Sequence, residues 1–201
     1  MALRSFDFRV LIAPGLNDSG ADHWQTRWQA LHPAFERVEQ LRWDVPDLEA
    51  WSERLDHELR RSTRPALIVA HSFGCLATAH RAGISVPNVA GALLVAPADP
   101  EKFGVADILR NVALPFPSIV IGSTDDPWME SSRAADWARQ WGSQFVNAGA
   151  AGHINAESKL GDWPYGLQQL QRLALMAELP YRGKAVARLA ANWPRPVALS
   201  R

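Results

Sequence analysis

Residues 64–80, RPALIVAHSFGCLATAH, place one serine, Ser72, between a strand pattern and a helix pattern. The apolar run before it predicts a buried strand, and the alanine-rich run after it predicts a helix that ends near Gly83. A serine at such a junction is either an ordinary helix N-cap or a nucleophile held on a sharp turn. The nucleophile-elbow pattern is G-x-S-x-G, and here Ala70 replaces the first glycine while Gly74 supplies the second. Because alanine adds only a methyl group, the stretch fits a variant of the elbow.

The rest of the chain repeats this alternation of strand and helix. Apolar runs without polar alternation, separated by amphipathic segments, indicate a mostly parallel sheet with helices on both faces. We therefore expect a single compact α/β domain. Besides the strand before Ser72, the expected strands cover residues 8–14, 36–43, 89–97, 118–123 and 144–149, and a closing helix covers residues 166–179.

The length and charge of the chain limit its function classes. Its 201 residues suit one domain with a sizeable core. Basic and acidic residues balance at 21 each, so no overall field favours nucleic acid or a membrane surface as a partner. No apolar stretch approaches the ~20 residues that a membrane span needs. We expect a small-molecule substrate.

A change of composition near Pro180 divides the chain into a body, residues 1–180, and a basic C-terminal tail, residues 181–201. The tail holds five of the 21 basic residues and no acidic residue, so the body is net acidic. Two interpretations stay open: the tail lies on its own acidic body, or it binds a protein partner.

The single cysteine, Cys75, excludes a disulfide within the chain and favours a reducing compartment. The first residues, MALRSFDFRVLIAPG, contain scattered charges, and their apolar run is too short for a signal peptide. We expect a cytoplasmic protein.

Polar residues that could activate Ser72 follow two other expected strands. Asp125 and Asp126 come after residues 118–123, and His153 comes after residues 144–149. Reactive groups in an open α/β sheet gather beyond the carboxyl ends of the strands. A serine nucleophile needs a base and a third group that orients the base. Both aspartates compete for the third role, with an ordinary Asp-Pro turn as the alternative.

The remaining histidines fit the role of the base less well. His32, His57 and His80 lie within or at the end of expected helices, and His23 begins one. His71 adjoins the serine, but successive strand residues point to opposite faces of a sheet. No two histidines have a metal-ligand spacing. We expect neither a metal site nor a cofactor.

The order Ser72, Asp126, His153 is the chain order of α/β-hydrolase triads. The segments LIVAHSFG, GSTDDPW and GHINAES, with LGDWPYG, resemble the retinoblastoma-binding protein 9 family of small serine hydrolases. The opening IAPGLNDSGADHWQTRW is also similar to that family, and the similarity spans roughly residues 8–179.

The resemblance implies a compact α/β-hydrolase fold with a triad of Ser72, His153 and Asp126, the aspartate directly before the proline. It also implies that Gly or Ala is accepted at position 70. The expected function is hydrolysis of small esters or amides through an acyl-enzyme, as in carboxylesterases. The alternatives are acyl transfer by the same triad and a protein-binding or scaffold member of the fold with little hydrolysis.

Further residues complete the predicted site. The oxyanion would be bound by the backbone N–H groups of Phe73 and of Leu16, with Asn17 competing for the second position. Trp128 and Trp163 could wall an apolar pocket or serve only in packing. The 20 residues between the strands at 89–97 and 118–123 are too few for a large lid, so we expect an open or shallow site.

Overall fold

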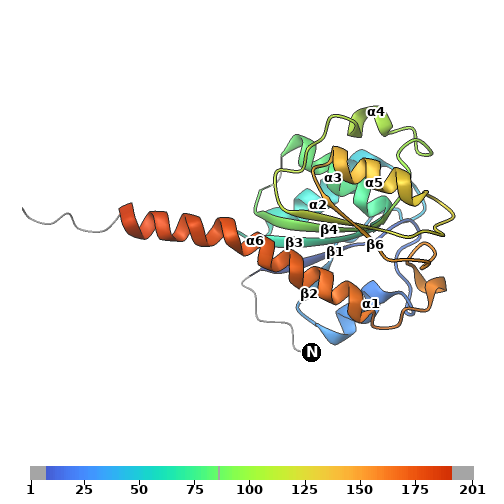
Figure 1. Ribbon diagram of the computed structural model, residues 1–201, viewed down its shortest axis with the longest axis horizontal. Helices are drawn as coiled ribbons and strands as arrows, with labels where there is room; N and C mark the ends of the chain where they lie inside the picture. Colours follow the sequence, from blue (N-terminus) through green and yellow to red (C-terminus); the bar gives the residue numbers. More distant parts are fainter. Residues whose placement is uncertain (1–7, 86, 192–201) are drawn as a thin grey trace, which may run out of the picture.

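The computed structural model describes the backbone of residues 8–85 and 87–191, and side chains as far as residue 178. Within this part, six strands form one parallel sheet with the order β2-β1-β3-β4-β5-β6 (Figure 1). The chain passes outward from β1 to β2, then returns to the other side of β1 for β3 to β6. The site where this order reverses lies between β1 and β3. The strands are β1 (Arg9–Ala13), β2 (Phe35–Arg37), β3 (Ala66–Ser72), β4 (Val89–Pro97), β5 (Ser118–Gly122) and β6 (Gln144–Asn147).

Helices cover both faces of this sheet (Figure 1). Two of them, α1 and α6, lie on one face, and α2, α3 and α5 lie on the other. The helices are α1 (Trp24–Leu31), α2 (Leu48–Arg60), α3 (Phe73–Ile84), α4 (Ala106–Leu109), α5 (Ser131–Gln140) and α6 (Pro164–Ala191), with one short 3-10 helix, η1 (Ala156–Ser158).

Two apolar cores result, one on each side of the sheet. In β3, Leu67 and Val69 face the core under α1 and α6, whereas Ile68 and Ala70 face the core under α2, α3 and α5. Because both faces of the central strands are buried, their sequences are apolar without interruption. The predicted single α/β domain with a parallel sheet and helices on both faces is confirmed.

One predicted strand is much shorter than expected. The run 36–43 was expected to be a strand, but β2 ends at Arg37 and its last ladder contact is the Val38 N–H to the carbonyl of Ile12, 2.8 Å away. The residues that follow form an exposed loop in which Leu41 is 85% exposed. The alternating pattern there belongs to a loop that leaves the edge of the sheet.

Two further features bear on the predicted organisation. The segment between β4 and β5 holds only the four-residue helix α4, in agreement with the absence of a large lid. The backbone of α6 continues through residue 180 to Ala191, across the predicted boundary between body and tail. Residues 192–201 lie outside the described part, and the division of the chain at residue 180 stays a prediction.

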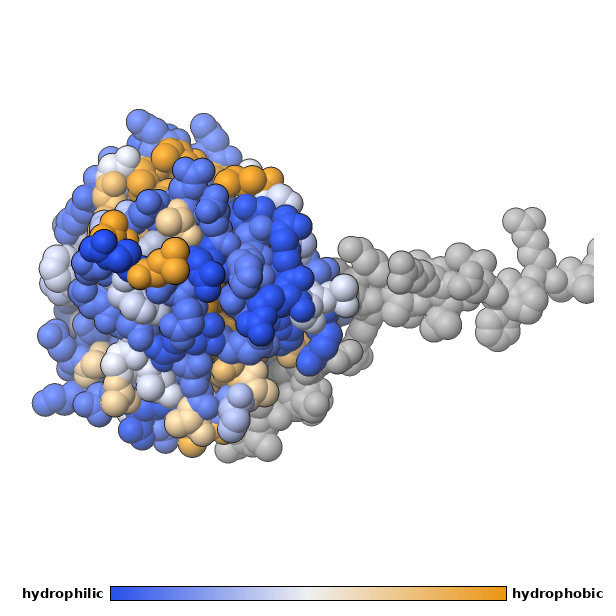
Figure 2. Space-filling view, turned by 180° about the vertical axis from the view of Figure 1, so that it is seen from behind, coloured by the Kyte–Doolittle hydropathy of each residue, from blue (hydrophilic) through white to orange (hydrophobic). Residues whose placement is uncertain are grey.

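The surface seen in Figure 2 is mainly hydrophilic, with apolar residues scattered over it. No helix in the described part of the chain is long and apolar enough to cross a membrane.

Candidate active site

Ser72 sits on a tight turn at the end of β3, directly before α3. Its backbone has φ 51° and ψ −120°, a conformation that costs a non-glycine residue energy and persists only where its surroundings enforce it. The helix start packs against the end of β1: a Cβ at position 74 would lie 2.4 Å from the carbonyl oxygens of Ala13 and Pro14. Glycine is therefore required at 74. Ala70 is fully buried within the sheet, so the methyl group is accommodated there.

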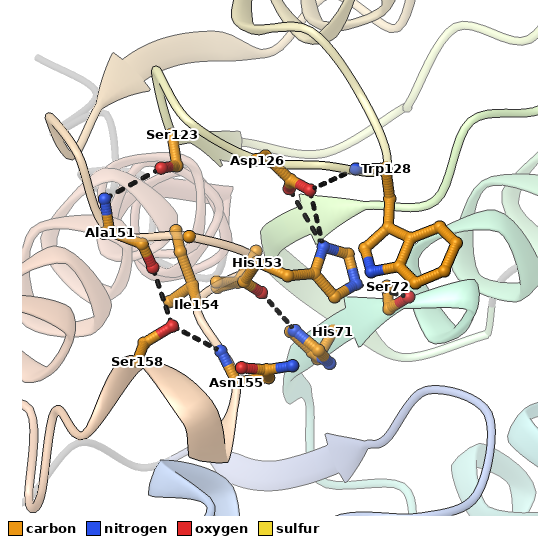
Figure 3. Close-up of polar contacts among 12 residues, drawn as sticks. His71, Ser72, Ser123, Asp126, Trp128, Ala151, His153, Ile154, Asn155 and Ser158 are labelled. Atoms are coloured by element: carbon orange, nitrogen blue, oxygen red, sulfur yellow. Dashed lines mark hydrogen bonds and ion pairs between the residues drawn. The ribbon is translucent and has the colours of Figure 1, made fainter.

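The hydroxyl of Ser72 is not used as a helix cap. Ser72 occupies the N-cap position of α3, but its side chain makes no capping hydrogen bond. Instead, Ser72 Oγ lies 3.0 Å from His153 Nε2 (Figure 3). The contact joins residues 81 positions apart in the chain and directs the hydroxyl toward an imidazole.

His153 in turn contacts a carboxylate. Its Nδ1 lies 2.9 Å from Asp126 Oδ2 and 3.0 Å from Oδ1, and both side chains are nearly excluded from solvent, at 10% and 3% exposure. An ionised carboxylate can only accept, so the Nδ1–H donates to Asp126 and Nε2 is left to accept from Ser72. The Trp128 N–H also donates to Asp126 Oδ1, at 2.9 Å, and holds the carboxylate in place. The three side chains form one continuous hydrogen-bonded series (Figure 3).

The neighbouring aspartate has a different set of partners. Asp125 Oδ1 accepts from Ser123 Oγ at 2.8 Å and from the Gly152 N–H at 2.7 Å. The Ser123 hydroxyl, followed by the Gly152 N–H, lowers the pKa of Asp125. Of the two competing aspartates, the structure therefore brings Asp126 to the imidazole, whereas Asp125 accepts a hydrogen bond from the backbone of the loop that carries the imidazole.

That loop, residues 148–155, is held by the hydroxyls of Ser123 and Ser158, which no sequence motif indicates. Ser123 Oγ accepts from the Ala151 N–H at 2.9 Å. Ser158 Oγ donates to the Ala151 carbonyl at 2.7 Å and accepts from the Asn155 N–H at 3.2 Å (Figure 3). Serines in loops of small residues give no distinctive signal in a single sequence, so only the tertiary contacts reveal them.

Two buried histidines, His23 and His71, lie beside this series and also line the pocket over Ser72. His71 Nε2 lies 3.0 Å from the carbonyl oxygen of His153, and the His71 ring is 4.8 Å from that of His23, centroid to centroid. Burial lowers the pKa of His71 well below its ordinary value, with His23 and His153 adding to the effect. Burial, then the charges of Arg37 and His153, lowers the pKa of His23 to about 4. Both rings are neutral near pH 7.

The alternation of strand side chains was the reason to set His71 aside. His71 keeps that alternation, since it lies on the same face of the sheet as Val69 and contacts the rings of His23 and Trp24. Ser72, with its positive φ, departs from regular strand geometry, and the two consecutive side chains reach the same residue, His153, one at its backbone and the other at its ring. Within the described residues, no group of three or more His, Cys, Asp or Glu is arranged to hold a metal ion.

A pocket of about 530 Å³ opens over Ser72. Trp128, for which a pocket wall and simple packing were both open, lines this pocket, is 58% exposed, and has its ring centroid 6.4 Å from that of His153. Lys102 lines it as well and donates through Nζ to the Trp128 carbonyl at 2.7 Å. Leu16, Ala98 and Phe103 add apolar surface. The pocket combines an apolar wall with polar groups beside the serine.

Trp163 does not line this pocket. It is 5% exposed and packs with Trp24 and Trp28, at centroid distances of 4.8 and 5.9 Å. Trp24 Nε1 also donates to the carbonyl of Ile154, the residue after the histidine, at 2.7 Å. Trp163 therefore serves in packing. The cluster of Trp24, Trp28 and Trp163 holds the loop of residues 148–155 through the hydrogen bond from Trp24 to Ile154.

The predicted oxyanion donors differ in availability. The Asn17 N–H donates to the Trp43 carbonyl at 2.8 Å and is thereby occupied. In the described part of the chain no hydrogen bond engages the Leu16 N–H, and Phe73 N–H is in the first turn of α3, where intrahelical acceptors are lacking. A Cβ at Gly15 would lie 2.8 Å from Ser72 Cβ, so the loop that carries Leu16 packs directly on the serine.

Comparison with known proteins identifies the family of this chain. The family described as serine hydrolase matches residues 10–172, most of the chain. The chain belongs to the serine hydrolase family. A solved structure of a YdeN-like hydrolase from Pectobacterium atrosepticum is 37% identical to this serine hydrolase, covers 85% of it and 92% of its own chain, and superposes with a TM-score of 0.82.

More distant structures share the fold of this serine hydrolase. The YdeN protein of Bacillus subtilis is 20% identical over 83% of this chain and 98% of its own, with a TM-score of 0.67. A thermophilic esterase from Thermogutta terrifontis is 17% identical over 84% and 89%, with a TM-score of 0.60. No curated protein sequence matched the chain. Fold, family and a general hydrolase activity are thus established.

Proposed function

We propose that this serine hydrolase cleaves small esters or amides through an acyl-enzyme on Ser72, in the manner of a carboxylesterase. The observation that carries the proposal is the hydrogen-bonded series Asp126–His153–Ser72, with contacts of 2.9 and 3.0 Å. A base within hydrogen-bond reach of a hydroxyl, oriented by a carboxylate on its other nitrogen, is the arrangement that activates a serine.

Acylation would proceed as follows. Ser72 Oγ attacks the substrate carbonyl carbon while its proton passes to His153 Nε2, and Asp126 stabilises the imidazolium that forms. The oxyanion of the tetrahedral intermediate accepts from the N–H groups of Phe73 and Leu16. The bond from carbonyl carbon to leaving group then breaks, and the leaving oxygen or nitrogen takes the proton from His153.

Deacylation uses the same groups with water as the nucleophile. His153 takes a proton from the water molecule as its oxygen attacks the acyl carbon. The bond between that carbon and Ser72 Oγ then breaks, and Oγ recovers the proton from His153. The products are a carboxylic acid and the regenerated hydroxyl.

The pocket supports a small substrate. A volume of about 530 Å³ is within the range typical of small-molecule sites. The apolar wall of Phe103 and Trp128 would contact the acyl or leaving group next to Ser72. The narrower membership in the retinoblastoma-binding protein 9 family, carried by the motifs around Ser72 and His153, and the cytoplasmic location stay predictions.

The test is hydrolysis of a short p-nitrophenyl ester by the full chain and by two matched variants. Asp126→Asn should lower kcat by ~10⁴-fold, because the amide favours the wrong tautomer of His153. Asp125→Asn should lower it by no more than about tenfold, since an amide oxygen still accepts from the Gly152 N–H.

An equal or larger loss at Asp125 would contradict the assignment of the two aspartates. Absence of turnover by the wild-type protein across a panel of short esters and amides would instead support the alternative function, a protein-binding member of the fold with little hydrolysis.

A further inference from the structure

We infer that His71 is a positioning residue: its Nε2–H holds the backbone carbonyl of His153 and thereby sets the place of the base relative to Ser72. The inference rests on the proposed function, since it concerns the same serine and histidine. His71 itself takes no proton in the reaction.

The contact with the His153 carbonyl determines which ring nitrogen of His71 carries the proton. His71 Nε2 lies 3.0 Å from the carbonyl oxygen of His153, and a carbonyl can only accept, so Nε2 carries the proton. In a neutral imidazole Nδ1 is then unprotonated. The ring thus offers its single N–H to the backbone of the residue that serves as base.

The ring is enclosed by contacts on several sides. A Cβ at Gly15 would lie 3.4 Å from His71 Nδ1, which places the loop after β1 against that edge. The His153 carbonyl meets the Nε2 edge, and the rings of His23 and Trp24, from the start of α1, lie 4.8 and 6.2 Å away. The ring of His71 therefore lies between the loop that carries Leu16 and the loop that carries His153, and it contacts both.

The absence of charge on His71 matters for the base. The titratable groups that face it are His23 and His153, and burial keeps the pKa of His71 well below its ordinary value. A positive charge at this point, 5.0 Å from the His153 ring centroid, would oppose the imidazolium that forms during the reaction. A neutral N–H fixes the loop without that penalty.

The placement of His153 is otherwise set by a loop, and loops move more than strands. Ser123, Asp125 and Ser158 hold the backbone at Ala151 and Gly152. His71 holds the backbone of His153, and it is the residue directly before the nucleophile on β3. The nucleophile and the residue that holds the base are thus consecutive in β3, so one buried strand positions both. A displacement of about 1 Å in such a site can cost ~10²-fold in rate.

The experiment compares His71→Gln with His71→Asn by kcat and KM for the p-nitrophenyl ester. The glutamine amide N–H can occupy the position of Nε2, whereas the asparagine amide is one methylene too short. We expect Asn to lower kcat by about 10- to 100-fold with KM changed less than about threefold, and Gln to be at least about tenfold faster than Asn. If the smaller side chain prevents folding, as judged by thermal unfolding, His71→Phe serves as the variant without the N–H.

A matched pair at another histidine provides the control. His80 lies on α3 and contacts Ser52 Oγ at 2.9 Å, remote from the base loop, so His80→Gln and His80→Asn should have equal kcat. Equal kcat for the two His71 variants, whether both are normal or both reduced, would overturn the inference. If Ser72→Ala remains as active as the wild type, the proposed function itself fails, and with it the inference.

Discussion

At Ser72 the chain leaves its strand with a φ of 51°, and this single backbone angle determines which side chains meet. It turns the hydroxyl away from the helix cap and toward His153, 3.0 Å distant. The preceding residue, His71, faces α1 as regular strand alternation requires, and its Nε2 reaches the backbone of the same histidine. The sequence motif indicated a turn at this point, but a motif does not contain the angle, so the regular alternation of a strand was expected and His71 was set aside.

The two adjacent aspartates are a second case in which residue types alone left the answer open. Asp125 and Asp126 both follow β5 and both are typical of a turn before proline. Their roles separate only through contacts with residues about 27 positions later, Gly152 for the first and His153 for the second. Family resemblance favoured Asp126, and the imidazole of His153 contacts Asp126. Its catalytic role stays a proposal.

Buried neutral histidines make the stability of the protein depend on pH. The pKa of His23 is about 4 in the folded protein against an ordinary value near 6.5. Between these two pH values His23 binds a proton in the unfolded chain but not in the folded protein. The contribution of neutral His23 to the unfolding free energy is therefore fully present above pH 6.5 and is lost as the pH falls toward 4. Between pH 7 and pH 5 the wild type should lose about 2 kcal/mol more of its unfolding free energy than His23→Asn.

Urea unfolding at the two pH values measures this difference. Asparagine at position 23 can still accept the Gln25 N–H that His23 Nδ1 accepts at 3.2 Å, so the cap of α1 is retained. A wild type and His23→Asn with parallel pH dependence would show that His23 is not responsible.

Among the secondary-structure elements, those buried on both faces were the most predictable. The apolar runs at 89–97 and 118–123 match β4 and β5 within one residue, because central strands need apolar side chains at every position. The prediction of a strand over residues 36–43 was wrong beyond residue 37. At the edge of the sheet a half-exposed loop and a half-exposed strand show the same alternation of polar and apolar residues. The length of α6 was underestimated: a helix over residues 166–179 was expected, but the backbone helix continues through the change of composition at residue 180 to Ala191.

The junction of β3 and α3 gives the sharpest test at this scale. A Cβ at Gly74 would stand 2.4 Å from two backbone carbonyl oxygens of the Ala13–Pro14 segment, atoms that cannot move without displacing β1. Gly74→Ala should lower the free energy of unfolding by at least about 2 kcal/mol.

Gly20 is a matched glycine, because a Cβ there would have nothing within 4 Å. Gly20→Ala should change the unfolding free energy by no more than about 0.5 kcal/mol. Chemical denaturation of both variants is the measurement, and equal stabilities would contradict the close approach of α3 to β1.

For the molecule as a whole, the site is a consequence of topology. Ser72, Asp126 and His153 each follow a parallel strand, so all three emerge at the carboxyl edge of the sheet. Ser72 lies beside the point where the strand order reverses, the position at which open α/β sheets bind ligands. Alternation of strands and helices along the sequence was sufficient to predict this layout. The dimensions of the pocket and the inward packing of Trp163 depend on long-range contacts that one sequence does not display.

If Ser72 is an activated nucleophile, the folded protein reacts covalently with a serine-directed reagent. The native protein is treated with a fluorophosphonate, whose fluoride is displaced as Oγ bonds to phosphorus, and the modified peptide is identified by mass spectrometry. We expect one adduct, on Ser72, that is absent from Ser72→Ala and from protein denatured beforehand. An unmodified Ser72 in the folded protein, or an adduct that persists in Ser72→Ala, would contradict this expectation.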